Sequence, residues 1–404
     1  MTRIRVVEVL GNSEGGGATF VMNLIESLDP GRFAVTLIAP EASWVAERCA
    51  AAGARYLPLP LMSSRISRTL RAQLAAALSE ANPDIIHAHG TRAAWYVRSQ
   101  LPSGADRPLF LYSEHLFSFD ARRGLARLPW YAIERTLCRR ADAVLTGAPF
   151  NARRLLAMGW VTPERIACDR VGFPAADVRG QLEHPVPRAL LGVEEGARLV
   201  GSVGRLVPQK GWPYLLRAFA EVIIHTPASR LLIVGDGEER QALERQAEAL
   251  GIAGHVHFVG FQRDPWSWLA TCDVIALHSL WEGEWQTPLE AVAARLPLVV
   301  TRVGGVEDYV ADGETGVVVP PRDAPALAEA IGALLGDAAR REAMRAAPRD
   351  ILAEFDVART QRTIAALYER SATRRREGGR EPISASRLAP SALAQNDGEE
   401  GYPG

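Results

Sequence analysis

Two glutamates in the stretch 278–319 have the type and spacing needed to bind a sugar. Glu282 lies in a predicted loop just after the apolar run 273–277, which has the character of a buried strand. A carboxylate in such a loop can accept hydrogen bonds from two hydroxyls or balance a developing oxocarbenium charge. Glu290 lies one turn into the next helical pattern, where Thr287-Pro-Leu-Glu290 also fits a capping box. Glu290 is therefore either a helix cap or a ligand contact, whereas Glu282 has no such structural explanation.

A second loop, 204–211, carries two cations that could bind a diphosphate. It follows the predicted strand 199–203 and contains Arg205 and Lys210, the only lysine among 46 basic residues. Arg205 offers a planar set of donors and Lys210 a compact ammonium. Together they could neutralise the charge that builds up on a leaving phosphate. The loop does not fit the Walker A pattern. The alternative is a pair of solvated surface cations.

A run of three glycines, 15–17, separates the first predicted strand from the first predicted helix. At Gly16 and Gly17 the absence of Cβ lets the backbone approach a ligand, and the helix N-terminus offers free N–H groups to an anion. The run is not the GxGxxG fingerprint of dinucleotide-binding proteins, and a plain tight turn is the alternative. In the second half of the chain Asp236 also follows a strand, and we expect it to cap the next helix rather than contact a ligand.

Three histidines follow strand patterns in the first half of the chain: His87, His89 and His115. Each could be an ordinary buried histidine with satisfied hydrogen bonds. His115 lies beyond the predicted strand 109–113, where it is suited to hydrogen bond a substrate hydroxyl or phosphate.

The region 112–154 is rich in arginine and aromatic residues. This composition indicates a surface that binds an anionic bilayer or an acidic acceptor. The alternative is a helix face that is exposed only to solvent. The residues concerned are Arg122, Arg123, Arg127, Arg135, Arg139, Arg140, Arg153 and Arg154, with Phe117, Phe119, Trp130, Tyr131 and Phe150 among them.

Strand-like and helix-like patterns alternate along the chain, which indicates parallel sheets joined by right-handed crossovers. The polar, proline-bearing stretch 179–188 predicts a linker. The fold class is therefore α/β with two doubly wound domains, 1–180 and 189–370, and a disordered tail, 371–404. The last helix ends the second domain or packs back on the first. We expect strands at 3–10, 33–39, 84–88, 109–113 and 143–146, and at 199–203, 230–234, 255–259, 273–277, 297–300 and 316–319.

Composition limits the class of function. A net charge of -1 argues against nucleic-acid binding through bulk electrostatics. The four cysteines lack metal-binding spacing, and we expect a reducing compartment. The chain begins with a strand pattern and no signal peptide, and no apolar run approaches the roughly 20 residues that span a bilayer. We expect a cytoplasmic protein, either free or peripheral on the inner face of the cell membrane.

Together these residues resemble glycosyltransferase family 4, a family of retaining enzymes with the GT-B fold. The resemblance covers residues 3–370 and rests on the order and spacing of motifs that are individually weak. The motifs are Ser13-Glu-Gly-Gly-Gly-Ala18, Ser113-Glu-His115, Arg140-Ala-Asp142, Gly204-Arg with Lys210-Gly, Val234-Gly-Asp-Gly, Phe258-Val-Gly-Phe261, Glu282-Gly with Leu289-Glu290-Ala, and Gly304-Gly with Glu307 and Gly313-Glu-Thr-Gly316.

The resemblance implies two Rossmann-like domains facing across a cleft, the first binding the acceptor and the second the nucleotide-sugar. It implies transfer of a sugar from a nucleotide-diphosphate sugar to a glycan or lipid-linked acceptor, in the synthesis of cell-surface polysaccharide or glycolipid. A UDP-sugar is the commonest donor in the family. The anomeric configuration would be retained, and neither a cofactor nor a metal ion would be required. Closure of the two domains would complete the site.

The resemblance also implies a role for each candidate residue. Arg205 and Lys210 would hold the donor diphosphate, Glu282 would contact the donor sugar and Glu290 the ribose. Gly16 and Gly17 would let the first domain approach the diphosphate, and Gly260 would belong to the nucleotide-binding residues. His115 would touch the transferred sugar and, with Arg205, Lys210 and Glu282, form the catalytic set.

The sequence departs from the family pattern at three places, one of which is the loop 172–177, where the usual Asn-Gly step is missing. Gly283 is followed by Glu284-Trp-Gln286 instead of an apolar step, which leaves the donor sugar open, and Arg295 replaces a small residue for no reason visible in the sequence. A rival enzyme is a GT-B nucleotide-sugar epimerase, a class that lacks the loop cations and glutamates in combination. The non-enzyme rival is a catalytically silent scaffold of a polysaccharide assembly complex, which would need neither Lys210 nor Glu282.

Overall fold

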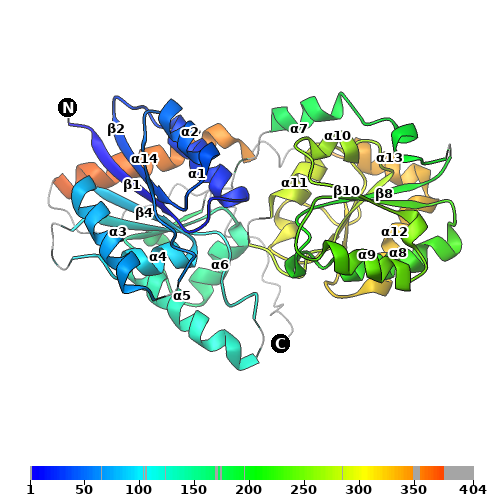
Figure 1. Ribbon diagram of the computed structural model, residues 1–404, viewed down its shortest axis with the longest axis horizontal. Helices are drawn as coiled ribbons and strands as arrows, with labels where there is room; N and C mark the ends of the chain where they lie inside the picture. Colours follow the sequence, from blue (N-terminus) through cyan, green and yellow to red (C-terminus); the bar gives the residue numbers. More distant parts are fainter. Residues whose placement is uncertain are drawn as a thin grey trace. The chain divides into compact units, whose positions relative to one another are not determined.

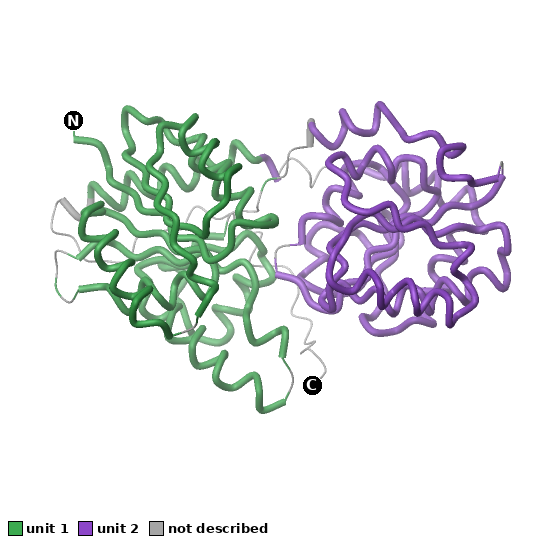
Figure 2. Tube along the Cα trace, in the orientation of Figure 1, with its two compact units in different colours: residues 1–172, 357–404 green, residues 173–356 purple. Residues whose placement is uncertain are grey.

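The computed structural model consists of two α/β units (Figures 1 and 2). Unit 1 comprises residues 1–172 and 357–404, and unit 2 comprises residues 173–356. The structure describes residues 2–64, 66–102, 104, 107–122, 124–168, 172, 175–194, 196–283, 285–348 and 355–376. Within them no helix combines the length and apolarity needed to cross a membrane.

Unit 1 is built on a seven-stranded, all-parallel sheet with the order β3-β2-β1-β4-β5-β6-β7. Strands β4 and β6 are buried along their whole length, as expected for a sheet covered on both faces. The strands are β1 (Ile4–Leu10), β2 (Phe33–Ala39), β3 (Arg55–Pro58), β4 (Ile85–His89), β5 (Leu109–Glu114), β6 (Ala143–Thr146) and β7 (Ile166–Cys168).

Helices cover both faces of this sheet. One apolar cluster joins the sheet to α3, α4, α5 and α6, and two others join it to α1, α2 and the C-terminal helix α14. In Figure 1 the orange helix α14 lies beside the blue strands and helices of unit 1, although the segment before it in the sequence belongs to unit 2. The helices are α1 (Gly16–Ser27), α2 (Ser43–Ala51), α3 (Arg68–Ala81), α4 (Gly90–Arg98), α5 (Leu128–Arg140), α6 (Pro149–Ala157) and α14 (Val357–Arg376).

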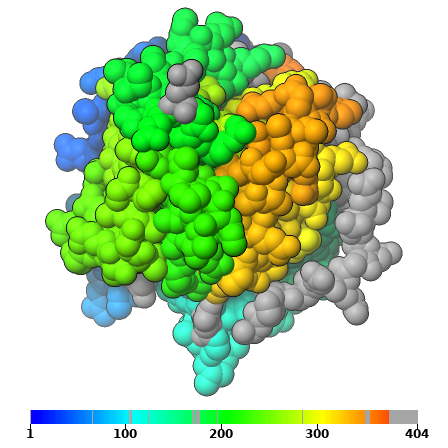
Figure 3. Space-filling model, turned by 90° about the vertical axis from the view of Figure 1, so that its right-hand side faces the viewer, coloured from blue at the N-terminus to red at the C-terminus, as the bar shows by residue number. Residues whose placement is uncertain are grey.

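Unit 2 repeats the architecture with a six-stranded parallel sheet of order β10-β9-β8-β11-β12-β13. One face packs on α7, α10 and α11, and the other on α8, α9, α12 and α13. Helix α12 packs against α8, and Figure 3 shows the orange part of the chain lying against the green part on this side. The elements are β8 (Leu199–Val203), β9 (Arg230–Val234), β10 (Val256–Gly260), β11 (Val274–Leu277), β12 (Leu298–Thr301), β13 (Val317–Val319), α7 (Ala175–Leu182), α8 (Trp212–His225), α9 (Arg240–Ala249), α10 (Pro265–Leu269), α11 (Gln286–Ala293), α12 (Ala324–Gly336) and α13 (Ala338–Ala346).

In both sheets the strand order reverses beside the first strand of the unit. Strand β1 lies between β2 and β4, and β8 lies between β9 and β11. Ligands of open α/β sheets bind at such a switch point, outside the carboxyl ends of the strands. The loops after β1 and β4 in unit 1, and after β8 and β11 in unit 2, are therefore the places to look for a site.

The expected α/β class with two doubly wound domains is confirmed, and the expected strands all form. The short strands β3 and β7 and the helices α4 and α6 were not expected. The domain limits also differ from 1–180 and 189–370. The predicted linker begins in α7, which unit 2 holds through bonds from Trp266 N and Ser267 Oγ to Gln181. Helix α14 belongs to unit 1, because its apolar side completes that core. The predicted disordered tail, 371–404, is wrong for residues 371–376, which continue α14, and the rest of it lies outside the described residues.

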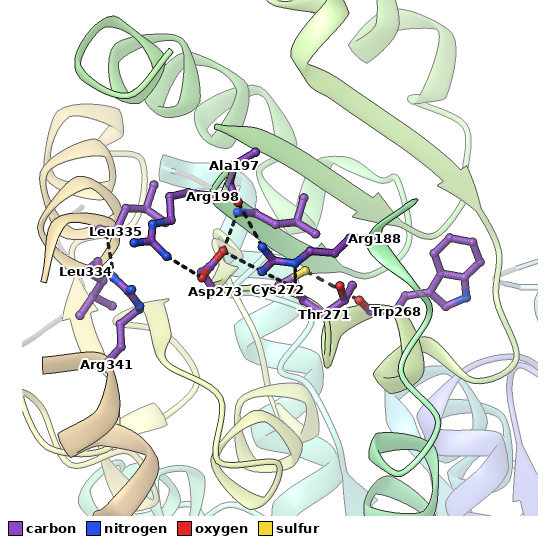
Figure 4. A network of polar contacts seen from close by, with 11 residues as sticks. Arg188, Ala197, Arg198, Trp268, Thr271, Cys272, Asp273, Leu334, Leu335 and Arg341 are labelled. Atoms are coloured by element: carbon purple, nitrogen blue, oxygen red, sulfur yellow. Dashed lines mark hydrogen bonds and ion pairs between the residues drawn. The ribbon is translucent and has the colours of Figure 1, made fainter. Parts of the chain in front are cut away.

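One polar network ties the amino end of the unit 2 sheet together (Figure 4). The carboxylate of Asp273 accepts hydrogen bonds from the backbone N–H of Leu199, at 2.9 Å, and from the guanidinium of Arg188, at 2.9 Å. Arg198 lies 3.4 Å from its other oxygen. Only 13% of the Asp273 side chain is exposed, so these partners replace water around a nearly buried charge.

We predict that Asp273→Asn lowers the free energy of unfolding by about 1–3 kcal/mol, because it weakens charge-assisted bonds at a buried position. Urea unfolding of the full chain measures the change. The control is Glu244→Gln, which removes the exposed i,i+4 pair with Arg240 and should cost about 0.5 kcal/mol or less. Equal losses in the two variants would contradict the special role of Asp273.

Candidate functional site

The loop after β8 is held against the loop after β11 by close backbone contact. Gly211 adopts a left-handed φ of 73°, and a Cβ there would lie 2.5 Å from the carbonyl oxygen of His278. The N–H of Leu280 donates to the carbonyl of Gln209 at 2.8 Å. Only glycine at 211 permits this approach, which brings Lys210 next to Glu282.

His278 fixes the backbone that carries Lys210. Burial lowers the pKa of His278 to about 4, so its ring is neutral. Its Nδ1–H donates to the carbonyl of Lys210 at 2.7 Å, which leaves Nε2 to accept from the hydroxyl of Ser202 at 3.0 Å. The indole N–H of Trp212 donates to the carbonyl of Arg205 at 2.8 Å. These hydrogen bonds therefore fix the backbone at both Lys210 and Arg205.

Lys210 and Glu282 form an ion pair of 2.6 Å between Nζ and Oε1. Ser279 Oγ donates to the same oxygen at 2.6 Å, and the amide of Gln209 donates to Oε2 at 2.9 Å. Only 17% of the Lys210 side chain and 9% of the Glu282 side chain are exposed. The interpretation of Lys210 as a solvated surface cation is therefore wrong. Arg205, in contrast, is exposed.

The glycine turn after β12 supports Glu282 from the other side. Gly304 has φ of 64°, and a Cβ there would lie 2.9 Å from Cβ of Glu282. The hydroxyl of Thr301, at the end of β12, donates to the carbonyl of Ser279 at 2.7 Å. Three strand ends, those of β8, β11 and β12, thus fix one carboxylate at the switch point.

Glu290 is not a helix cap. Helix α11 begins at Gln286, so Thr287 lies inside it and no side chain caps its N-terminus. The predicted capping box is therefore wrong. Burial raises the pKa of Glu290 to about 7, against the opposite effects of a hydrogen bond from Trp266 and the charge of Lys210. A partly exposed carboxyl with a raised pKa is a group that can hydrogen bond a polar ligand.

The predicted cap at Asp236 is also wrong. Helix α9 begins at Arg240, and the Asp236 carboxylate accepts from the N–H of Gly237 at 2.8 Å. Gly260, at the end of β10, has φ of 75°, and its carbonyl accepts from the N–H of Gly235 at 2.8 Å. A Cβ at Gly235 would meet the carbonyl oxygen of Gly204 at 2.0 Å, so the loops after β8, β9 and β10 are in contact.

In unit 1 a cavity of about 310 Å³ lies at the switch point. Helix α1 starts at Gly16, two residues earlier than expected, with Gly15 as N-cap at φ of 80°. Gly16 and Gly17 are therefore the first residues of a helix rather than loop residues, and Gly17 lines the cavity together with His89 and His115. A Cβ at Gly17 would meet no atom within 4 Å, so that side of the glycine faces open space.

Glu8, His87 and His89 are close enough to raise the question of a metal, since their ligand atoms lie within 4.8 Å of one another. All three side chains are fully buried. Their nitrogen and oxygen atoms are engaged with one another and with Tyr368, Ser113 and His115. A metal would have to displace these hydrogen bonds, and the group fits a hydrogen-bonded network better than a metal site.

The structure brings together Lys210 and Glu282 in unit 2, and Gly17 and His115 in unit 1. Sequence reasoning missed Gln209, Ser279 and the contact of Gly304 with Glu282. It also missed Glu8, although an acidic residue inside the apolar run Val6-Val-Glu-Val-Leu10 was a visible signal. Arg295 has a left-handed φ of 56°, which disfavours arginine, but its guanidinium gives it a structural role by donating to the carbonyl of Arg345, in the last turn of α13. Glu284 lies outside the described residues.

Comparisons with known proteins agree with this geometry. Residues 15–168 match the model of the glycosyl transferase 4-like domain, and residues 188–350 match that of glycosyl transferases group 1. The chain is 30% identical over 349 residues to a 2-deoxystreptamine N-acetyl-D-glucosaminyltransferase of Streptomyces fradiae, covering 80% of this chain and 81% of the relative. It is 29% identical over 326 residues to the lipopolysaccharide core biosynthesis glycosyltransferase LpsE of Rhizobium meliloti, covering 80% and 86%.

Solved structures show the same fold. The HepE protein of Anabaena, crystallised with UDP, superposes with a TM-score of 0.72 at 19% identity, covering 91% of this chain and all of that chain. The lipopolysaccharide glycosyltransferase WaaG superposes with a TM-score of 0.69 at 18% identity, covering 90% and 99%. The expected GT-B fold is confirmed. The two family models match consecutive parts of the chain, and the chain covers most of the length of its relatives. The chain therefore belongs to the group 1 glycosyl transferases, and it is a transferase.

Proposed function

We propose that the protein is a retaining glycosyltransferase that moves a sugar from a UDP-sugar to a glycan or lipid-linked acceptor of the cell surface. The observation that carries the proposal is the ion pair between Lys210 and Glu282 at the switch point of unit 2. Relatives named as lipopolysaccharide core glycosyltransferases, LpsE and LpsD of Rhizobium meliloti, support the acceptor class. Structures of HepE with UDP and with UDP-glucose support the donor.

In this proposal the donor diphosphate binds beside the loop after β8. Arg205 and Lys210 hold its charge, and Glu290 accepts hydrogen bonds from the ribose. Gly260 lies in the loop contact next to the nucleotide. Glu282 contacts the donor sugar, and its bond to Lys210 keeps the ammonium in place before the donor arrives. No metal ion takes part.

The proposed reaction is a displacement on one face of the sugar. The acceptor oxygen bonds to the anomeric carbon on the side from which the diphosphate leaves, and the hydroxyl proton of the acceptor passes to the leaving phosphate. Lys210 and Arg205 stabilise the charge that develops on that phosphate. Gly16, Gly17 and His115 belong to unit 1, and their roles toward the diphosphate and the transferred sugar rest on the resemblance to the family.

We predict that Lys210→Met lowers kcat for sugar transfer by a factor of about 100 or more, because it removes a cation that stabilises the leaving group. Release of UDP from a panel of UDP-sugars, with a lipopolysaccharide core acceptor, measures the effect. The control is Arg217→Met, which removes a basic side chain stacked on Tyr214 in α8, away from the strand ends. Normal turnover by Lys210→Met, with intact secondary structure, would refute the site.

We predict that Glu290 makes UDP binding depend on pH. Its carboxyl has a pKa of about 7 in the free protein, so it carries a proton below pH 7 and loses it above. Ribose hydroxyls donate better to the carboxylate, and the affinity of the wild type relative to Glu290→Gln should therefore rise as pH increases through 7. Isothermal titration calorimetry with UDP at about pH 6 and about pH 8 measures the affinity of each protein. The ratio of the wild-type affinity to that of Glu290→Gln is then compared between the two pH values, because the protonation of UDP itself affects both proteins equally and cancels in this ratio. A ratio independent of pH would remove the ribose contact from the proposal.

We further propose that unit 1 rests on an anionic membrane surface through the start of α5. Leu125 is 82% exposed and Leu128 59% exposed, and both lie beside Arg127. The exposed Arg135 and Arg139 follow on the same helix. Apolar side chains among arginines are the combination that binds anionic lipid.

The membrane proposal predicts that the double variant Leu125→Ser and Leu128→Ser binds vesicles containing phosphatidylglycerol about tenfold more weakly than the wild type, because less apolar surface enters the bilayer. Co-sedimentation with the vesicles measures binding. Ile224→Ser is the control, since Ile224 is exposed on unit 2. Unchanged binding by the double variant would exclude this surface.

A further inference from the structure

A chain of buried polar side chains runs through unit 1 behind the wall of the cavity. It starts at His115, whose Nε2 lies 3.3 Å from Nδ1 of His89, with the two rings stacked at 5.5 Å. His89 Nε2 lies 2.8 Å from Oε2 of Glu8. The other oxygen of Glu8 accepts from the hydroxyl of Tyr368 at 2.6 Å.

The chain continues to a second histidine. His87 Nδ1 lies 2.6 Å from the hydroxyl oxygen of Tyr368, and Nε2 lies 2.7 Å from the hydroxyl of Ser113. The groups come from β1, β4, β5 and α14. Glu8, His87 and Tyr368 are fully buried, and His89 is only 3% exposed, so water cannot replace a missing partner.

Donors and acceptors can be assigned along this chain. Burial holds the pKa of His87 well below its usual value, so its ring is neutral. Burial keeps Tyr368 protonated by raising its pKa. The Tyr368 hydroxyl has one proton, which it gives to the Glu8 carboxylate, and its oxygen then accepts from His87 Nδ1–H. His87 Nε2 is left to accept from Ser113.

Donors and acceptors can be assigned in the same way from Glu8 through His89 to His115. The Glu8 carboxylate has only lone pairs to offer, so His89 must donate to it through Nε2–H. A neutral His89 then has a bare Nδ1, which accepts from Nε2–H of His115. The Phe20 ring makes T-shaped contacts with both imidazoles, at centroid distances of 6.2 Å and 5.7 Å.

We propose that Glu8 and Tyr368 are positioning residues that set the tautomer of His89 and, through it, the orientation of His115 in the cavity. Glu8 acts directly on His89, and Tyr368 holds Glu8. The significance for catalysis rests on the proposed function, in which His115 contacts the transferred sugar. The inferred proton positions do not depend on it.

Ring nitrogen spectra of the full-length chain test the inference. The protein has 8 histidines, so labelling only histidine with ¹⁵N gives few signals, which single replacements assign. Two-bond correlations show which ring nitrogen carries the proton. The wild type should show His87 protonated at Nδ1, and His89 and His115 protonated at Nε2. A wild-type His89 with its proton on Nδ1 would overturn the proposal.

The variant Glu8→Gln gives a signature that a merely structural role would not produce. The amide oxygen still accepts from His89 Nε2–H, but the amide N–H₂ now donates to Tyr368. Tyr368 must then give its proton to His87, and His87 should move its proton from Nδ1 to Nε2 while His89 keeps its tautomer. An unchanged His87 in this variant would refute the inferred chain.

A second variant, Glu8→Met, removes both acceptor atoms at similar volume. His89 should lose its single tautomer, and kcat for UDP release should fall by a factor on the order of 10–100, with KM for the donor little changed, because His115 is misoriented. Wild-type histidine spectra in Glu8→Met would refute the proposal. Altered spectra with unaltered kcat would refute the role of His115 in the proposed function and leave the inferred chain standing.

The matched control is Ser371→Ala, on the same helix as Tyr368. Ser371 is fully buried and donates only to its own helix, to the carbonyl of Leu367 at 2.6 Å. Its loss should leave both the histidine spectra and kcat unchanged. A change in the histidine spectra of Ser371→Ala would show that they report the packing of α14 rather than the chain through Glu8, and would overturn the assignment.

Discussion

The contact between Gly211 and the carbonyl of His278 is the constraint on which the unit 2 site depends. A side chain at 211 would separate the loops after β8 and β11, and the Lys210 ammonium would no longer reach the Glu282 carboxylate. An ammonium and a carboxylate that are nearly buried must be paired, because neither can be left without a partner at an affordable free energy. The loop contact thus makes the ion pair geometrically possible, and the ion pair makes the low exposure of both charges tolerable.

Unit 1 also contains a buried carboxylate whose hydrogen-bond donors come from other elements, but the donors are of different types. Its central strand β1 carries a carboxylate, Glu8, and the neighbouring strand β4 supplies His89 as one of its donors. In unit 2 an ammonium and two neutral donors satisfy the carboxylate, and in unit 1 a tyrosine and a histidine do so. Both units therefore hold a buried carboxylate in a fixed orientation, within β1 in unit 1 and in the loop after β11 in unit 2, and binding sites need polar groups that are fixed in this way.

The sequence predicted the parallel sheets and the position of Glu282, because alternating apolar runs and a polar loop after a strand are local signals. It could not predict the partners of Glu282, since Gln209 and Ser279 are brought to it by the fold. The capping box failed for a physical reason. Helix α11 begins at Gln286, before the Pro288 that the box would make its first residue, and the buried Trp285 takes the N-cap position, so Thr287 lies inside the helix and has no helix end to cap. The apolar face of α14 predicted burial, but nothing local says against which sheet.

The return of α14 to unit 1 makes that unit discontinuous in sequence, and this affects how the chain acquires its structure. During synthesis residues 1–172 emerge first, without the Ile364, Leu367 and Tyr368 side chains that close one face of their sheet. The Glu8 carboxylate lacks one of its two donors until the last helix arrives. Unit 2 can fold from a continuous segment as soon as it emerges, whereas unit 1 is completed only after α14 has emerged. The older half of the polypeptide is therefore the last to become native.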